Sequence, residues 1–373
     1  MLRFAILLFC LPAIVLSSCL NAQPAGNLPM LTLIQDLEIP NFSASVVSFS
    51  GDGATFIVGS KYDGLGLFRA NDFTLIERYY APTSRNILDS KPTAVTHGMG
   101  YIDTNTWYFA AREWGGGNPV VAHIRTIQPS EDIATYSFEM HGEVLIANKN
   151  HIGLYEEMVN WHDGEHYHVK ILHPNLSGYE LTRSSRVLTT SYNIGGIFID
   201  DPVNGKAEYL EDAVKISPNE HHAIILKWKQ CKLLQFPENK EIGTCGRMPL
   251  FSNRDRHRFE FSPDGKLFVS WLDGKARVYQ VEPFQLKSEF DMPGKAFSMA
   301  LTISDSGWVA AIDLKKYDYE NARLRAWDGL TGKLVGYYQT SAEALAIQPN
   351  GNKLIAVNNR RIMVFGLPER IAQ

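Results

Sequence analysis

The sequence predicts an all-β protein, built from repeated four-stranded sheets that close into a ring. Three observations support this prediction. A short turn sequence recurs at intervals of about forty residues, and pairs of short apolar strands recur with it. One further strand pattern, which elsewhere follows such a pair, is found near the N-terminus before the first pair. The chain has 373 residues, of which 45% are hydrophobic, so it can bury a large core.

The turn phrase combines an apolar residue, a small polar residue and a tight turn. Clear copies are Phe49–Gly53, Phe261–Gly265, Ile303–Gly307 and Ile347–Gly351, and Ile216–Glu220 is a looser copy. Asp-Gly and Asn-Gly supply the backbone angles of a hairpin turn. The last three spacings are 45, 42 and 44 residues, and the first is 167, close to four times 42. Three degenerate copies are therefore expected between the first copy and the second.

Paired strands give an independent count of the repeats. Eight pairs of short apolar strands are joined by short connections: Thr55–Gly59 with Gly66–Arg69, Trp107–Arg112 with Val120–Arg125, Val144–Asn148 with Ile152–Glu156, Val187–Ser191 with Gly196–Asp200, Ala223–Trp228 with Lys232–Phe236, Leu267–Leu272 with Ala276–Val281, Val309–Asp313 with Leu324–Asp328, and Leu354–Asn358 with Ile362–Phe365. We therefore expect eight blades of four strands. Seven blades is the alternative, because the middle of the chain is degenerate.

One further strand pattern indicates how the array closes. Leu75–Pro82 and Leu286–Pro293 follow two of the paired strands, and each has leucine first and proline eighth. The last repeat lacks this strand, but Leu33–Pro40 supplies the same pattern at the N-terminal side. A ring closed by strands from both ends leaves no orphan edge. The sequence thus predicts a closed β-propeller whose N-terminal strand completes the last blade.

Two segments resemble the blades of WD40-like β-propellers in bacterial exported proteins. Phe261–Ser270 is similar to the first turn and second strand of such a blade, and Arg325–Gly332 is similar to its third strand with Trp-Asp and the Thr-Gly turn. The resemblance is good over 257–366, fair over 45–82 and weak over 93–215. The Gly-His dipeptide of many WD40 blades is missing, so their structural hydrogen-bond relay is not expected. The resemblance implies a single propeller domain over 30–373.

The N-terminal segment is typical of an export signal. Arg3 is followed by an apolar run to Leu16, which is too short to cross a bilayer comfortably. Leu16-Ser-Ser-Cys19 resembles the bacterial lipobox, which implies removal of residues 1–18, lipidation of Cys19 and a lipidated tether over 19–29. Leu20 is not acidic, which by the same resemblance permits sorting to the outer membrane, facing the periplasm. The alternative is an ordinary secretory signal cut after Ala22, which would leave a soluble periplasmic or secreted protein.

Two cysteines remain in the body of the chain. Cys231 and Cys245 flank a predicted strand and the loop after it. In an exported chain they would form one disulfide, and two reduced thiols are the alternative. Neither has a second ligand nearby at the spacing of a zinc site.

The densest group of polar side chains is Trp161–His168. His166 and His168 alternate, so on a strand they share one face. With His162 and a nearby carboxylate they are candidates for a metal site. The alternative is a turn at Asp163-Gly164 that places the histidines at the surface.

Two long hairpin loops and one turn are candidate partner-contact sites. The glycine-rich segment Arg112–Asn118 would present Arg112 and Trp114, and Lys315–Asn321 would present Tyr317 and Tyr319. Trp161 is a further candidate, because tryptophan and tyrosine are enriched at interface hot spots. Solvated linkers are the alternative interpretation. The glycines do not form a phosphate-binding loop, since no lysine follows them.

These features favour a non-enzymatic, protein-binding scaffold anchored by lipid at the periplasmic side of the bacterial cell envelope. The chain contains no Gly-x-Ser-x-Gly and no His-Glu-x-x-His motif, and no cofactor is expected. The net charge of −4 does not favour nucleic acid as a partner. The alternative is a metal-binding or small-ligand-binding propeller, with or without catalysis, that uses its central funnel. In that case the histidines would point inward at one mouth of the ring.

Overall fold

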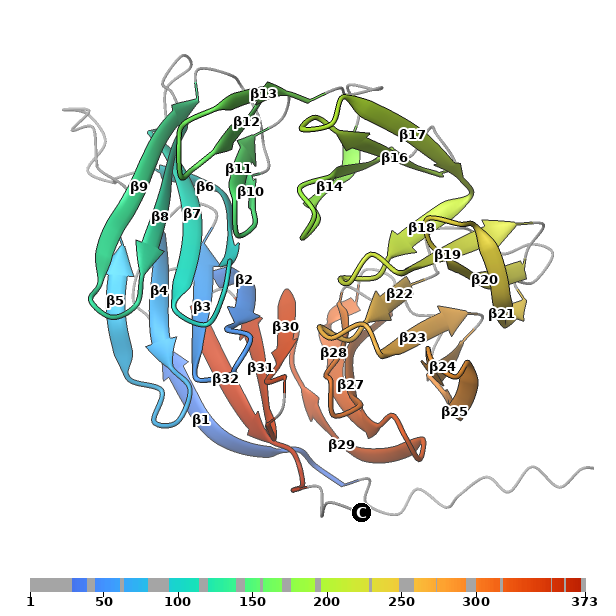
Figure 1. Cartoon of the computed structure of the whole chain (residues 1–373). Coiled ribbons are helices and arrows are strands. Elements are labelled where there is room, and N and C mark those ends of the chain that lie inside the picture. Colours follow the sequence, from blue (N-terminus) through green and yellow to red (C-terminus); the bar gives the residue numbers. More distant parts are fainter. Residues whose placement is uncertain are drawn as a thin grey trace, which may run out of the picture.

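The structure is a computed structural model, and its described residues form a ring of strands (Figure 1). It describes residues 29–38, 44–60, 64–79, 94–113, 120–138, 145–154, 157–169, 176–191, 196–227, 230–247, 258–272, 274–292, 300–315, 318–349, 351–358 and 360–369. These residues fold into eight four-stranded antiparallel sheets and contain no helix. We number the sheets as blades 1 to 8 in chain order.

The first four blades come from the N-terminal half. Blade 1 contains β2 (Ala44–Phe49), β3 (Thr55–Ser60), β4 (Gly64–Arg69) and β5 (Leu75–Tyr79). Blade 2 contains β6 (Ala94–Tyr101), β7 (Thr106–Glu113), β8 (Val120–Thr126) and β9 (Glu131–Phe138). Blade 3 contains β10 (Leu145–Ala147), β11 (His151–Leu154), β12 (Glu157–Asn160) and β13 (His166–His168). Blade 4 contains β14 (Leu176–Leu181), β15 (Val187–Ser191), β16 (Gly196–Asp201) and β17 (Lys206–Glu211).

The other four blades complete the ring. Blade 5 contains β18 (Ala213–Ile216), β19 (His222–Lys227), β20 (Gln230–Gln235) and β21 (Lys240–Arg247). Blade 6 contains β22 (Arg258–Phe261), β23 (Leu267–Leu272), β24 (Lys275–Gln280) and β25 (Gln285–Asp291). Blade 7 contains β26 (Leu301–Ile303), β27 (Trp308–Lys315), β28 (Asp318–Asp328) and β29 (Lys333–Gln339). Blade 8 contains β30 (Ala344–Ile347), β31 (Lys353–Asn358), β32 (Arg361–Gly366) and β1 (Thr32–Glu38).

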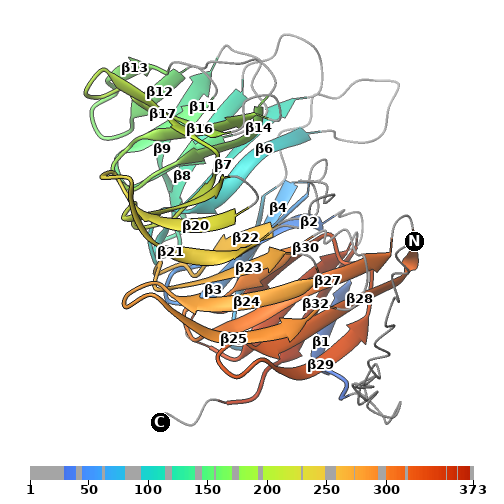
Figure 2. The ribbon, with the colours of Figure 1, turned by 90° about the vertical axis from the view of Figure 1, so that its right-hand side faces the viewer.

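Every blade has its strands in simple up-and-down order, with the first strand toward the axis of the ring and the fourth at the rim (Figure 1). The eight predicted hairpins all lie within blades, so the prediction of eight is confirmed. In seven blades they are the second and third strands. In blade 3 the pair predicted at Val144–Asn148 and Ile152–Glu156 corresponds instead to the first and second strands, β10 and β11. Figure 2 shows the sheets of blades 5 to 7 from the side, following one another around the ring.

The N-terminal strand closes the ring as predicted. β1 pairs antiparallel with β32, from Thr32 opposite Gly366 to Glu38 opposite Arg361. The Arg361 guanidinium also forms an ion pair with the Asp36 carboxylate on the same pair of strands. The last blade therefore takes its outer strand from the other end of the domain.

The core lies between the blades rather than within them. Seven apolar clusters each combine residues of two neighbouring blades. One of them packs Phe56 and Val58 of blade 1 against Ile355 and Val364 of blade 8, so the seam at which the ring closes also has an apolar core. Burial of these side chains is the main favourable term that holds neighbouring blades together.

The recurring phrase forms the turn between the first and second strands of a blade. In blade 6 the buried Ser262 hydroxyl donates to Asp264 Oδ1 at 2.7 Å and accepts from the amide of Leu267 at 3.0 Å. Ser50 makes the same two bonds in blade 1. The glycine that follows has a positive φ, 75° at Gly265. The phrase recurs because serine, carboxylate and glycine each satisfy one requirement of this turn.

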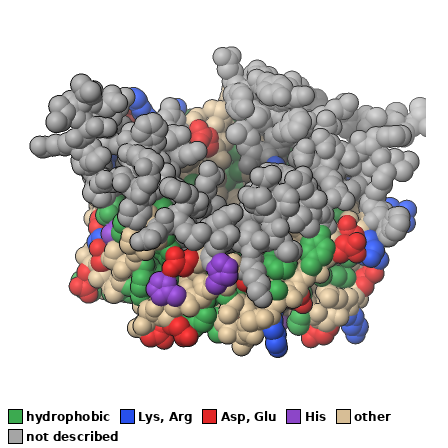
Figure 3. Space-filling view, turned by 90° about the horizontal axis from the view of Figure 1, so that it is seen from above, with side chains coloured by type: hydrophobic (Ala, Val, Ile, Leu, Met, Phe, Trp, Pro, Cys, Tyr) green, Lys and Arg blue, Asp and Glu red, His purple; other side chains and the backbone are tan. Residues whose placement is uncertain are grey.

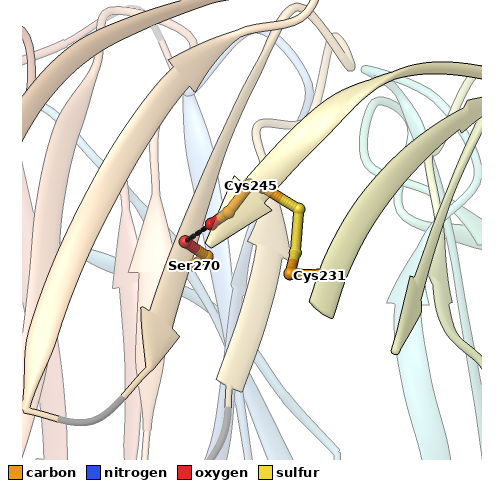
Figure 4. Close-up of a disulfide and its surroundings, with 3 residues drawn as sticks. All are labelled: Cys231, Cys245 and Ser270. Atoms are coloured by element: carbon orange, nitrogen blue, oxygen red, sulfur yellow. Dashed lines mark hydrogen bonds between the residues drawn. A yellow bond between two sulfur atoms is a disulfide. The ribbon is translucent and has the colours of Figure 1, made fainter. Parts of the chain in front are cut away.

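The predicted disulfide is present. Cys231 on β20 and Cys245 on β21 are joined in blade 5, with Cα atoms 5.0 Å apart (Figure 4). Both are fully buried and pack in the apolar cluster between blades 5 and 6. Ser270 of blade 6 donates a long hydrogen bond of 3.5 Å to the Cys245 carbonyl oxygen. The bridge therefore joins two outer strands where they meet the next blade.

One loop prediction is wrong in its extent. The segment Lys315–Asn321 was expected to be a lengthened hairpin loop. β27 instead continues to Lys315 and β28 begins at Asp318, and these two residues are paired. Pairing with a neighbouring strand extends the hairpin through a polar segment whose composition alone favoured a loop.

Candidate functional site at the seam of blades 3 and 4

Polar side chains join blades 3 and 4 at the described part of their seam. Among the described residues, no apolar cluster joins these two blades, in contrast to the other seven seams. Asn148 Nδ2 donates to the Thr182 carbonyl oxygen at 2.7 Å and to Ser185 Oγ at 3.0 Å. His151 Nδ1 lies 2.7 Å from the same hydroxyl. These hydrogen bonds fix the geometry of the seam without adding much net stability, and the buried His151 Nε2 has no hydrogen-bond partner among the described residues.

Next to this seam, the turn between β12 and β13 presents a tryptophan. Trp161 Nε1 donates to the Asn148 carbonyl oxygen at 3.1 Å, and the Trp161 carbonyl oxygen accepts from the Tyr136 hydroxyl at 3.0 Å. Its half-buried ring lies 3.8 Å, centroid to centroid, from the exposed His162 ring. We call Trp161–Tyr167 the blade 3 turn. Two hydrogen bonds from blades 2 and 3 thus hold its aromatic residue in place.

Two carboxylates follow the aromatic pair along the blade 3 turn. Asp163 Oδ2 accepts from the Asn160 side-chain amide at 3.1 Å, and Asp163 Oδ1 accepts from the amide of Glu165 at 2.9 Å. The Tyr167 hydroxyl donates to Glu165 Oε2 at 2.6 Å, and this bond raises the pKa of Tyr167 to about 12. The turn therefore combines a fixed aromatic pair with exposed negative charge.

His151 and Ser185 have the atom pairing of a base and a nucleophile, but their surroundings indicate a structural role. Both side chains are almost completely buried, at 5% and 4% exposure, so a substrate cannot reach them. Burial lowers the pKa of His151 and favours its neutral form. Ser185 has a positive φ of 67°, and its hydroxyl contacts Asn148 and His151 of blade 3. We interpret the pair as a clamp between the two blades.

The candidate metal-binding histidines do not share a common contact among the described residues. His162 Nε2 lies 3.1 Å from the Lys149 carbonyl oxygen, and His166 Nδ1 lies 2.7 Å from Glu157 Oε1. His166 and His168 share a face of β13, as expected, but β13 is the outermost strand of its blade, so they do not line the funnel. Within the described ranges, no group of three or more His, Cys, Asp or Glu side chains could hold a metal ion.

Figure 3 looks onto the rim formed by the blades at the top of Figure 1. Histidine side chains lie there close to acidic ones, on the outside of the ring.

For the other predicted contact residues, the structure gives at most the strand in which each lies. Arg112 lies in β7 and Tyr319 lies in β28. Trp114, Tyr317 and the lipidation candidate Cys19 lie outside the described residues. The described part of the chain has no helix that is long and apolar enough to cross a membrane.

A second polar cluster, between blades 1 and 2, was not predicted. Arg125 of β8 pairs with Glu77 of β5 at 2.8 Å, and His123 Nε2 lies 3.3 Å from the Tyr79 hydroxyl. The Phe109 and His123 rings stack at 4.8 Å. Glu77 and Tyr79 alternate along β5, and His123 and Arg125 alternate along β8, so each pair lies on one face of its strand. This alternation is the only sequence signal that could have indicated the seam.

Comparisons with known proteins address the fold. No family model and no curated protein sequence matches this chain. Solved structures do match. The β-propeller domain of Cps50 (Swd1) from Myceliophteria thermophila is similar with a TM-score of 0.54 and 11% identity, over 91% of this chain and all of that one. The C-terminal WD40 domain of Sif2 is similar with a TM-score of 0.66 and 14% identity, over 92% of this chain and all of that one. The chain therefore has the fold of a WD40-like β-propeller.

Proposed function

We propose that this protein is a non-enzymatic scaffold that binds another protein through the blade 3 turn. The observation that carries the proposal is the fixed position of Trp161, whose ring and backbone are each held by a hydrogen bond while the residue remains partly exposed. A rigid, amphipathic aromatic residue binds with little loss of conformational entropy. The WD40-like fold is consistent with protein binding, and loops and turns on rigid scaffolds are common binding positions.

The charge of the turn indicates the chemistry of the partner. Asp163 and Glu165 follow the Trp161–His162 pair within the blade 3 turn, and both are exposed. We infer that the partner segment carries a lysine or arginine beside an apolar side chain. The basic group would pair with these carboxylates, and either group could pack on the indole face.

We further propose that the scaffold is anchored by lipid at Cys19. The anchor would lie in the outer membrane, and the scaffold would face the periplasm. The support for this is the sequence Leu16-Ser-Ser-Cys19 after an apolar run, together with the buried disulfide, which suits an oxidising compartment. Several acyl chains on one residue give firm attachment, whereas one chain gives only marginal binding.

Site-specific photo-crosslinking tests the binding surface. A photoreactive amino acid at His162 should capture a protein partner in cells, and the same residue at the exposed Lys240 of blade 5 is the matched control. Trp161→Ala should remove the adduct at position 162. Because Trp161 also supports the fold, Asp163→Asn with Glu165→Gln provides a second test on exposed side chains. Equal adducts at positions 162 and 240, or adducts that survive all these variants, would contradict the proposal.

Membrane fractionation tests the anchor separately. Wild-type protein should sediment with membranes and have the mass of a triacylated chain that begins at Cys19. Cys19→Ala should move the protein to the soluble periplasmic fraction. Unchanged mass and fractionation in this variant would refute the lipid anchor and leave the binding surface unaffected.

A further inference from the structure

The N-terminal segment is fastened to two blades. Before β1 begins, residues 29–31 run parallel to β29, the outer strand of blade 7. The amide of Leu31 donates to the Tyr337 carbonyl oxygen at 2.9 Å, and the amide of Tyr337 donates to the Pro29 carbonyl oxygen at 3.0 Å. The chain then continues as the outer strand of blade 8. We call residues 29–35 the strap.

The strap fits its position closely. Leu31 is buried in the apolar cluster that blades 7 and 8 share. Gly336 of β29 leaves space for the strap, because a Cβ there would lie 2.9 Å from the Leu31 nitrogen and 3.0 Å from the Met30 carbonyl carbon. A force on the N-terminus is therefore shared between two blades.

The exposed side chains of the strap carry no charge, and two of them are large and apolar. Met30 is 64% exposed and Ile34 is 47% exposed, and both are among the most exposed large hydrophobic residues described. The sequence carries no charged side chain from Phe4 to Gln35. A segment without charges avoids the cost of removing ions from water beside a lipid surface.

The proposed anchor lies a short distance away along the chain. Ten residue steps separate Cys19 from Pro29, which limits their separation to about 35 Å even in a fully extended chain. The strap lies at the seam of blades 7 and 8, at the bottom of Figure 1, and the blade 3 turn lies at the top. Blades 3 and 7 are four positions apart in a ring of eight, so they face in opposite directions.

We propose that Met30 and Ile34 of the strap rest on the phospholipid surface, so that the ring stands on edge with the blade 3 turn farthest from the membrane. This inference rests on the proposed lipid anchor at Cys19. The lipid limits the distance, and the two apolar side chains set the orientation by entering the interfacial region. The partner-binding turn then faces into the compartment.

Lipid-based fluorescence quenching tests the orientation. The lipidated protein is reconstituted in phosphatidylethanolamine and phosphatidylglycerol vesicles that contain spin-labelled head groups. A fluorophore is attached to Met30→Cys or Ile34→Cys, with Val203→Cys in the turn between β16 and β17 of blade 4 as the control at similar exposure. The native disulfide and the acylated Cys19 do not react with the label. We expect quenching at positions 30 and 34 to be several times that at position 203.

Each contrary result has its own meaning. Vesicle-bound protein with equal quenching at positions 30, 34 and 203 overturns the orientation and leaves the anchor intact. Protein that fails to bind vesicles overturns the anchor, and the orientation with it. Protection of positions 30 and 34 from a water-soluble quencher without vesicles shows that a second copy covers the strap, which also overturns the proposal.

Discussion

The side-chain amide of Gln348 donates a hydrogen bond of 2.8 Å to the carbonyl oxygen of Gly53, which lies 295 residues away in the sequence. Both residues belong to copies of the recurring turn. Gln348 occupies the position that serine holds in the copies at Ser50 and Ser262, so its longer side chain reaches the next blade instead of closing its own turn. Lys353 Nζ adds a bond of 2.8 Å to the Ala70 carbonyl oxygen across the same seam. The turn of blade 8 thus differs from the other copies in a way that adds a hydrogen bond across the seam where the ring closes.

Gln348→Ala should weaken this seam by about 1 kcal/mol, the usual net value of one partly buried hydrogen bond. Chemical denaturation of the variant measures the change in the free energy of unfolding. Gln235→Ala, at an exposed strand position of blade 5, is the matched control and should change stability by less than half as much. Equal effects of the two substitutions would mean that the bond to Gly53 does not contribute to closure.

Gly336→Val should release the strap. The added Cβ would lie about 3 Å from backbone atoms of residues 29–31, and backbone yields less easily than a flexible side chain. We expect a loss of about 1–3 kcal/mol, as for other overpacked positions. Gly51→Ala is the control, since a Cβ there would have no atom within 4 Å. A Gly336→Val protein as stable as Gly51→Ala would show that residues 29–31 do not pack on β29.

Replacement of both Cys231 and Cys245 by alanine should cost about 3 kcal/mol, the value expected when a bridge that closes a loop of about 15 residues is removed. The alanines keep the buried site apolar. Reductant should lower the melting temperature of the wild type and leave that of the double variant unchanged. If the bridge is fully reduced and the melting temperature of the wild type does not fall, the bridge has no stabilising role.

The carboxyl group of Asp305 should make the stability of the fold depend on pH. Burial raises the pKa of its carboxyl from the usual 3.8 to about 6, and the nearby Asp264 carboxylate contributes in the same direction. The folded chain therefore keeps this proton at pH values where the unfolded chain has lost it. The contribution of Asp305 to stability is most favourable below about pH 4 and declines as the pH rises to about 6.

Asp305→Asn should remove this decline. The amide oxygen can still accept the hydrogen bond of 2.8 Å from the amide of Asp264. After allowance for solvent screening of a half-buried group, we expect a gain of about 1 kcal/mol at pH 7.5 and little difference at pH 4. Melting temperatures of both proteins across this range give the comparison. A gain that is largest at pH 4 would have the wrong sign and refute the assignment.

Local patterns predicted most of the fold. Eight alternating strand pairs and a turn phrase with Asp-Gly or Asn-Gly depend on neighbouring residues, and the structure contains them all. The Leu33–Pro40 pattern predicted the closing strand because the same pattern ends two other blades. Two cysteines, together with an N-terminal segment typical of export, were enough to predict the bridge.

Contacts between blades were not predictable in the same way. The bond from Gln348 to Gly53 and the pairing of residues 29–31 with β29 join positions about 300 residues apart, and nothing in the local sequence encodes a partner at that distance. The histidines of β13 illustrate the same limit. Alternation placed His166 and His168 on one face, but only the order of strands in the blade shows that this face lies at the rim.

Hydrogen exchange of the intact protein tests the closed ring most directly. β1 is an edge strand that pairs with β32 on one side, so about half of the amides in residues 32–38 should be protected as strongly as those of β32 itself. The peptide that spans these residues should therefore show slow exchange in the native state, limited by unfolding of the whole ring. Free exchange of residues 32–38 while β31 and β32 remain protected would contradict closure by the N-terminal strand.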